Sequence, residues 1–183
     1  SDGGLKSYLK EKNLITQMGA STKSKISSSQ FTSLRLEVKL SDLGFEKIDQ
    51  VLSAIYSYLL MMKEAPLDEH KRLFQEYMQK SITRFKFYTE RSELTNVNVS
   101  RAMKIFDDQD LLRGDDVLLE FNGDVINEFI NLMNDGKFNI TFTTDKHQDY
   151  NLRETIYNTE YDEVDLPEKF KKIWNERTLN SDF

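Results

Sequence analysis

Hydrophobic and charged residues alternate most regularly in residues 31–40. The apolar positions are Leu34, Leu36, Val38 and Leu40, and the charged positions between them are Arg35, Glu37 and Lys39. A period of two places the apolar side chains on one face of a strand and the charges on the other. Such a strand belongs to a sheet with one packed face and one solvated face, which is usually antiparallel. Residues 14–20 predict a second strand.

The spacing of apolar residues changes after residue 41. Residues 45–62 carry apolar side chains every three or four positions, which predicts one long helix with a single apolar stripe. Ser41 or Asp42 can cap its N-terminus. Pro66 ends it, because the residue before a proline is disfavoured in helical geometry. Pro66 also suits the first turn of a further helix, which we expect to run to about residue 88.

The rest of the pattern predicts shorter elements. Helices are expected at residues 5–13, 92–106, 116–121, 124–133 and 167–174, and a strand at residues 138–142. Residues 21–30 are rich in Ser and Lys and indicate a solvated loop. Helices and strands are mixed without a strict strand–helix–strand alternation. The predicted fold class is therefore α+β, a mostly antiparallel sheet with helices packed on one face.

Composition and charge narrow the classes of function. Acidic residues outnumber basic ones by 31 to 25, and the net charge of −6 disfavours nucleic-acid binding through a broad basic field. There is no cysteine, which excludes disulfides, cysteine zinc sites and thiol catalysis. No apolar run approaches the roughly 18 residues of a membrane span. The first residues lack an initiator Met and a signal-peptide pattern. We therefore expect a fragment of a longer protein, with a cytoplasmic location.

One short stretch comes close to a catalytic zinc motif. Residues 66–70 differ from H-x-x-E-H, the inverted zinc-peptidase motif, only because Pro66 replaces the first histidine. Catalytic zinc usually needs three protein ligands and an open position. His70 has no ligand one helical turn away, since Phe74 and Pro66 occupy those positions, and His147 lies in a polar stretch without a ligand pattern. We interpret the near-match as accidental and assign no metal ligand.

Other catalytic patterns are missing from the sequence. The acidic stretch at residues 107–116 does not fit a calcium-binding loop. Counted from Asp107, its sixth and twelfth positions are Leu112 and Leu118 rather than Gly and Glu. No nucleophile elbow, P-loop or dinucleotide-binding glycine pattern occurs. We assign no catalytic residue.

Seven short sequence segments occur in the same order and with the same spacing as in a known protein family. They are GLKSYLKEKNLITQMGA, LRLEVKLSDLG, IDQVLSAIYSYLLMM, RFKFYTE, LLEF, FNITFTT and TEYDEVDLPEKFKKIW. In this arrangement the chain resembles the insulin-degrading-enzyme branch of the inverted-zinc-motif metallopeptidases, which are also called the insulinase or pitrilysin type. The resemblance covers essentially the whole chain.

The resemblance implies a larger, multidomain parent protein. In that family four similar α+β domains pair into two halves around a closed chamber, and the zinc motif belongs to the first domain. Residues 1–183 look like most of the second, non-catalytic domain and are expected to form a single-domain fragment. The fragment alone should have no cofactor and no proteolytic activity, and zinc is expected in the parent's first domain. The implied partners are peptide substrates and other domains of the same chain, with no nucleic acid and no membrane.

The resemblance also implies an exosite, a substrate-anchoring site away from the catalytic zinc. Carried over to this chain, it comprises Gly3, Gly4, Met18, Gly19, Ala20 and Ser21. The family often has a second Gly where Ala20 or Ser21 stands, and a Cβ there occupies space that Gly leaves free. An exposed strand edge can bind a peptide as an additional strand, mainly through backbone groups.

Two other hypotheses stay open at this point. The chain could be a non-enzymatic interaction domain of an inactive family relative, of the processing-peptidase or respiratory-complex type. An H-x-x-E-H motif upstream in the same reading frame would favour the peptidase. A nucleic-acid-binding sheet would need aromatic residues on its solvated face. Phe138, Ile140 and Phe142 are instead expected on the core side, which makes this the weaker hypothesis.

Overall fold

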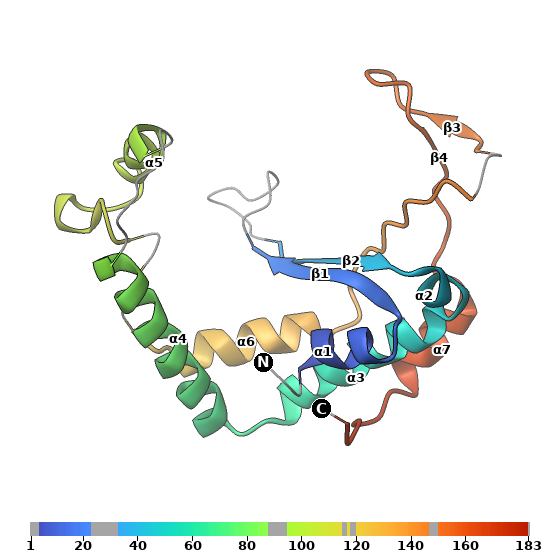
Figure 1. Cartoon of the computed structure of the whole chain (residues 1–183), viewed down its shortest axis with the longest axis horizontal. Coiled ribbons are helices and arrows are strands. Elements are labelled where there is room, and N and C mark those ends of the chain that lie inside the picture. The colour runs from blue at the N-terminus through green and yellow to red at the C-terminus, as the bar shows by residue number, and fades with distance from the viewer. Residues whose placement is uncertain are drawn as a thin grey trace. The chain divides into compact units, whose positions relative to one another are not determined.

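The computed structural model describes residues 4–22, 33–87, 95–114, 117, 120–146 and 150–182. Figure 1 traces the order of the elements along the chain. The chain divides into two compact units. The first unit comprises Ser1–Lys63 and Ile130–Phe183, and the second comprises Glu64–Phe129. The first unit therefore combines residues from both ends of the sequence.

The first unit begins with a helix, a strand pair and two further helices. They are α1 (Leu5–Glu11), β1 (Ile15–Ser21), β2 (Arg35–Leu40), α2 (Asp42–Glu46) and α3 (Ile48–Glu64). β1 and β2 are antiparallel, with Met18 opposite Val38 and Ser21 opposite Arg35. The register shifts between Ile15 and Gln17. These elements confirm the strand that the alternation predicted and the second strand predicted at residues 14–20.

A small apolar core joins α1, the strand pair and α3. Its buried members are Leu5, Leu9, Leu14, Ile15, Val51 and Ala54. Met18, Val38 and Leu40 pack against this cluster, so the apolar face of the strand pair is turned toward α3. The predicted packing of helices on one face of the sheet is confirmed for this part of the chain.

The single long helix predicted after residue 41 is two helices. Lys47 lies between α2 and α3 with φ −112° and ψ 37°, which interrupts the helical backbone. The predicted cap is confirmed, because the Ser41 hydroxyl accepts a hydrogen bond from the Gly44 N–H at 2.9 Å. The apolar spacing alone could not reveal the break, since it continues with little change across Lys47.

The rest of the first unit contains one helix, a short hairpin and a long extended segment. The helix α7 (Glu168–Asn175) and the strands β3 (Leu152–Arg153) and β4 (Glu160–Tyr161) are regular. The prediction of a strand at residues 138–142 is wrong. This segment joins no ladder among the described residues, because the described part of the chain supplies no strand beside it. Its Phe138 ring packs on Tyr56 and Trp174, with centroids at 5.6 and 5.0 Å.

The second unit consists mainly of helices. They are α4 (Leu67–Phe87), α5 (Thr95–Ala102), the 3-10 turn η1 (Asp108–Asp110) and most of α6 (Gly123–Met133), which continues into the first unit. The predicted helix at residues 92–106 is shorter than expected, and its proposed cap, Ser92, lies outside the described residues. The helix expected at residues 116–121 is also wrong where it can be checked, because Val117 and Glu120 are not helical.

The second unit contains an aromatic ring pair and a closely packed glycine. The Phe74 and Phe121 rings meet edge to face with centroids 5.5 Å apart. Gly114 lies so close to Phe106 that a Cβ would stand 2.6 Å from the ring. In the part of the chain that the structure describes, no helix combines the length and the apolar character needed to cross a membrane.

Candidate functional site

The turn between α1 and β1 places the first part of the candidate site. Asn13 adopts a positive φ of 56°, and the Leu14 N–H donates to the Leu9 carbonyl at 2.9 Å. This is the geometry in which a left-handed residue closes a helix C-terminus. Since Leu9 and Leu14 are also buried together in the core, the turn folds β1 back antiparallel to α1 (Figure 1).

Gly4 lies at the start of α1. It is the N-cap residue, and its N–H donates to the Ser7 hydroxyl at 3.1 Å. The Ser7 hydroxyl donates in turn to the Gly4 carbonyl at 2.9 Å. A helix rises about 1.5 Å per residue and a strand about 3.3 Å. Gly4 therefore comes approximately level with Met18 in the antiparallel β1. Gly3, the other predicted glycine, lies outside the described residues.

The four predicted residues on β1 have two different environments. Met18 is half-buried and packs against the core cluster, so it fixes the strand. Gly19, Ala20 and Ser21 are exposed at the end of the strand. An added Cβ at Gly19 would meet no atom within 4 Å, so the space beside this backbone is open. The strand end can therefore be approached closely by another chain.

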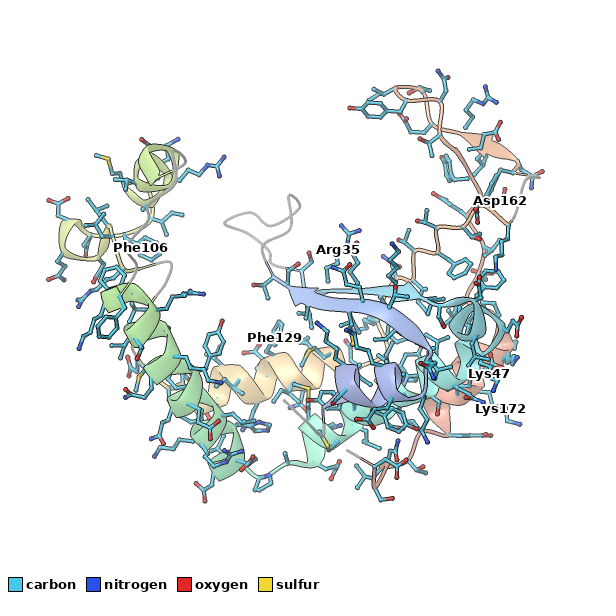
Figure 2. All side chains as sticks on the ribbon, in the orientation of Figure 1. Arg35, Lys47, Phe106, Phe129, Asp162 and Lys172 are labelled. Atoms are coloured by element: carbon cyan, nitrogen blue, oxygen red, sulfur yellow. The ribbon has the colours of Figure 1, made fainter. Side chains whose placement is uncertain are left out.

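The edge of β1 and the charged face of β2 are both open to solvent. β1 pairs with β2 on one side only, and no other described strand pairs with its opposite side. Arg35, Glu37 and Lys39 are exposed, as predicted from the alternation. Figure 2 shows the Arg35 side chain projecting from the strand pair on the side away from α1 and α3. Gly19 shares this face with Glu37, its cross-strand partner.

A junction that the sequence analysis did not predict supports the turn into β1. The Ser41 hydroxyl donates to the Asn13 carbonyl at 2.6 Å, and the Ser41 N–H donates to the Leu14 carbonyl at 3.1 Å. A Cβ on Gly44 would lie 1.8 Å from the Leu14 carbonyl oxygen. The only signal in the sequence was a Gly in the first turn of a predicted helix, where it lowers helix propensity.

The clearest pKa shifts lie away from this edge. Burial raises the pKa of Tyr56 above its ordinary value. A hydrogen bond from Arg72 lowers the pKa of the Glu69 carboxyl on α4. Neither group is on β1 or β2, so the candidate site combines backbone groups and exposed side chains rather than a tuned acid–base pair.

The described residues do not offer a zinc site. His70 is half-buried on α4 and has Pro66 and Phe74 one helical turn away. No group of three or more His, Asp or Glu side chains that could hold a metal occurs among the residues with defined positions. His147 lies outside that part of the chain.

The comparisons with known proteins give the family. The model described as the middle or third domain of peptidase M16 matches residues 84–183, which is more than half of the chain. The chain therefore belongs to this family, as the order of its sequence segments indicated. It corresponds to a middle region of an insulinase-type peptidase.

Individual relatives agree with this assignment. Human nardilysin is 26% identical over 158 residues, which cover 85% of this chain and 14% of nardilysin. Rat nardilysin is also 26% identical, over 85% of this chain and 13% of its own length. The crystal structure of pitrilysin matches with a TM-score of 0.64 and 20% identity, over 73% of this chain and 14% of that one. The α+β fold is thus shared with pitrilysin, and the chain spans about one seventh of the relatives it matches.

Proposed function

We propose that this chain is the substrate-anchoring, non-catalytic part of an insulinase-type zinc peptidase. The free edge of β1, which ends in Gly19, Ala20 and Ser21, carries the proposal. An unpaired strand edge offers N–H and C=O groups that can bind an extended peptide as an additional strand. Because most of the bonds go to backbone groups, such a site accepts many peptide sequences.

Three features of the β1 edge support this role. The space beside Gly19 is open, so a second backbone can come close. Met18 anchors the strand in the core, which keeps the edge rigid before a peptide arrives. Gly4 lies level with the anchored part of the strand and leaves the approach free of a side chain. A preorganised edge loses less conformational entropy on binding than a mobile one.

The surroundings of the site in the parent protein form the second part of the proposal. The charged face of β2 would line a hydrated chamber, and residues 1–183 would form most of a second domain. Zinc would be bound by another domain, in a longer chain such as those of the relatives. A cytoplasmic location belongs to the same proposal, and the absence of cysteine supports it.

Two proline variants test the peptide site. Neighbouring residues of a strand point their N–H groups to opposite sides. Of Gly19→Pro and Ala20→Pro, one therefore removes a bond to β2 and the other removes an outward donor. The probe is a fluorescein-labelled peptide of alternating Thr and Val, about ten residues long so that it can span a strand. Peptide binding to each variant is measured by fluorescence anisotropy. The free energy of unfolding of each variant is measured with urea.

The two variants should separate folding from binding. The variant that lacks the inward N–H should lose stability. The variant that lacks the outward N–H should keep its stability and weaken peptide binding by about tenfold, as loss of a main-chain bond in a preformed site predicts. Unchanged binding in the stable variant would overturn the proposal. Lys39→Pro on β2 is the control for proline in the same sheet.

A further inference from the structure

The solvated face of the strand pair carries a row of charges of alternating sign. Arg35, Glu37 and Lys39 occupy every second position of β2, and all three are exposed. None of their side chains forms an ion pair or a hydrogen bond with another residue in the part of the chain that the structure describes. On the β3–β4 hairpin, by contrast, Arg153 pairs with Glu160 of the neighbouring strand. The charges on β2 are therefore available to a ligand.

β1 separates this row of charges from the free edge, so its side chains decide which charges can be reached from that edge. Gly19 is the cross-strand partner of Glu37, and Gln17 is that of Lys39. An added Cβ at Gly19 would meet no atom within 4 Å, so the path from the edge to Glu37 is open. Gln17 places a long side chain in the corresponding path to Lys39.

The dimensions of a sheet allow a bound peptide to reach Glu37. Neighbouring strands lie about 5 Å apart, so a peptide paired with the outer edge of β1 lies about 10 Å from β2. Residues opposite each other in a ladder share a face, and a peptide residue opposite Gly19 therefore points to the same side as Glu37. A lysine or arginine side chain and a glutamate side chain together span this distance when no side chain stands between them.

We propose that Glu37 gives the peptide site a preference for a single basic residue, placed opposite Gly19 on the bound strand. The inference rests on the proposed peptide site at the β1 edge and adds a side-chain requirement to it. Bonds between backbones specify register only weakly where the side chains are polar, so a bound strand can slide by two residues. An ion pair with Glu37 selects one register and so fixes which segment of the peptide is held.

The two neighbouring cations restrict the preference to one positive charge. Arg35 and Lys39 lie two positions from Glu37 on the same face, and Arg35 stands opposite the small Ser21. Figure 2 shows Arg35 projecting from this face. A second basic residue, two positions along the peptide from the first, would come close to one of these cations and be repelled. Repulsion of unsuitable sequences is a common source of specificity.

Peptide affinities test this preference. Three versions of the fluorescein-labelled Thr–Val peptide carry Gln at one central Thr position, Lys at that position, or Lys there and at the Thr positions on both sides. For wild type, the peptide with one Lys should bind about threefold more tightly than the Gln peptide, as expected of an exposed ion pair. The peptide with three Lys should bind no more tightly than the peptide with one. A general attraction by the net charge of −6 would instead favour three Lys and would overturn the inference.

Substitutions identify the group responsible for the preference. Glu37→Gln should abolish the gain from the single Lys, and Gly19→Thr should reduce it, because a side chain would then stand in the path to Glu37. Glu64→Gln is the matched control, since it removes an exposed carboxylate at the end of α3 and changes the net charge equally. The gain should persist in this control. A gain that survives in Glu37→Gln, or that is lost equally in Glu64→Gln, would contradict the proposal.

Two outcomes separate this inference from the peptide site itself. Binding of the Gln peptide to wild type without any gain from Lys would overturn the inference and leave the peptide site intact. Absence of binding by every peptide would overturn both. The gain from Lys should also shrink as the salt concentration rises, because salt screens exposed charges. Urea unfolding of each variant checks that a change in preference does not come from a loss of folded protein.

Discussion

The helices α3 and α4 follow each other in the chain but differ in how much of them is buried. Five residues of α3 are buried, namely Val51, Leu52, Ala54, Tyr56 and Ser57, and Ser81 is the one described for α4. On α4, Leu73 and Tyr77 are 49% and 60% exposed. Both helices carry apolar residues at helical spacing. An amphipathic pattern therefore predicts a helix, whereas burial also requires partners on that face.

α3 has such partners on two sides. One side contacts the strand pair through Val51 and Ala54, and the other contacts Phe138 and Trp174 through Tyr56. α4 has the Phe74–Phe121 ring contact, and its exposed surface carries ion pairs of Arg72 with Glu69 and Glu76. Substitutions around α3 should consequently cost more stability than substitutions on α4.

The largest effect is expected for Gly44→Ala, at the junction that joins α2 to the α1–β1 turn. The new Cβ would lie 1.8 Å from the Leu14 carbonyl oxygen, and both groups are backbone-bound. We expect a loss of about 4 kcal/mol or more in the free energy of unfolding, measured with urea. Gly19→Ala is the matched control, because its Cβ meets open space, and it should be neutral or slightly stabilising.

The next largest effect is expected for Tyr56→Ala. Tyr56 is 3% exposed and its ring contacts Trp174 edge to face at 4.9 Å. Removing the ring should cost about 3 kcal/mol in unfolding free energy. Tyr56→Phe should cost little, because the buried hydroxyl has no hydrogen-bond partner among the described atoms. A large loss in the phenylalanine variant would show that the hydroxyl is bonded in solution.

Wild type and Tyr56→Phe should also differ in how the free energy of unfolding depends on pH. Burial raises the folded-state pKa of Tyr56 above its unfolded value of about 10. The protonated phenol is therefore favoured in the folded protein. Its contribution is fully present below about pH 10 and declines as the pH rises toward the folded pKa. Urea unfolding at pH 8 to about 11 should show a decline in wild type that is weaker in Tyr56→Phe. A steeper decline in Tyr56→Phe than in wild type would contradict a buried environment for the phenol.

An intermediate effect is expected for two helix caps, one in each unit. The Ser41 hydroxyl accepts from the Gly44 N–H and donates to the Asn13 carbonyl, whereas the Asn122 side-chain oxygen accepts from the Val125 N–H at 3.1 Å. Ser41→Ala should cost about 1.5 kcal/mol and Asn122→Ala about 0.7 kcal/mol in urea unfolding. A larger loss at Asn122 would reverse the contrast between the units.

The smallest effect is expected for Arg72→Ala on α4. The three charged groups are exposed, so solvent screens their attraction. The melting temperature should fall by about 1 °C or less. The Arg72 hydrogen bond lowers the folded-state pKa of Glu69, so its contribution is present above the unfolded pKa and is lost as the pH falls through the folded one. A melting curve by circular dichroism at neutral and acidic pH checks both points, and a larger shift would mean that α4 depends on this pair.

The sequence predicted the elements well where their periodicity was strong. The alternation in residues 31–40 located β2 and its solvated charges, and the spacing after Asp124 located α6. It was less successful between residues 92 and 121, where the apolar spacing is weak and the helices are short. For the candidate site, the glycines and the strand end came from a family resemblance. The structure then placed Gly4 at the start of α1 and Gly19 on an exposed edge.

Some features depended on tertiary structure alone. The sequence by itself determined the two-residue and three-to-four-residue periods of apolar positions and the charged face of β2. It also determined the order of segments that indicates the family. It could not show that Gly44 sits on the Leu14 carbonyl, because that contact joins residues 30 positions apart. Nor could it show that segment 138–143 lacks a partner. Periodicity records which face of an element is apolar, and only the folded arrangement decides what covers that face.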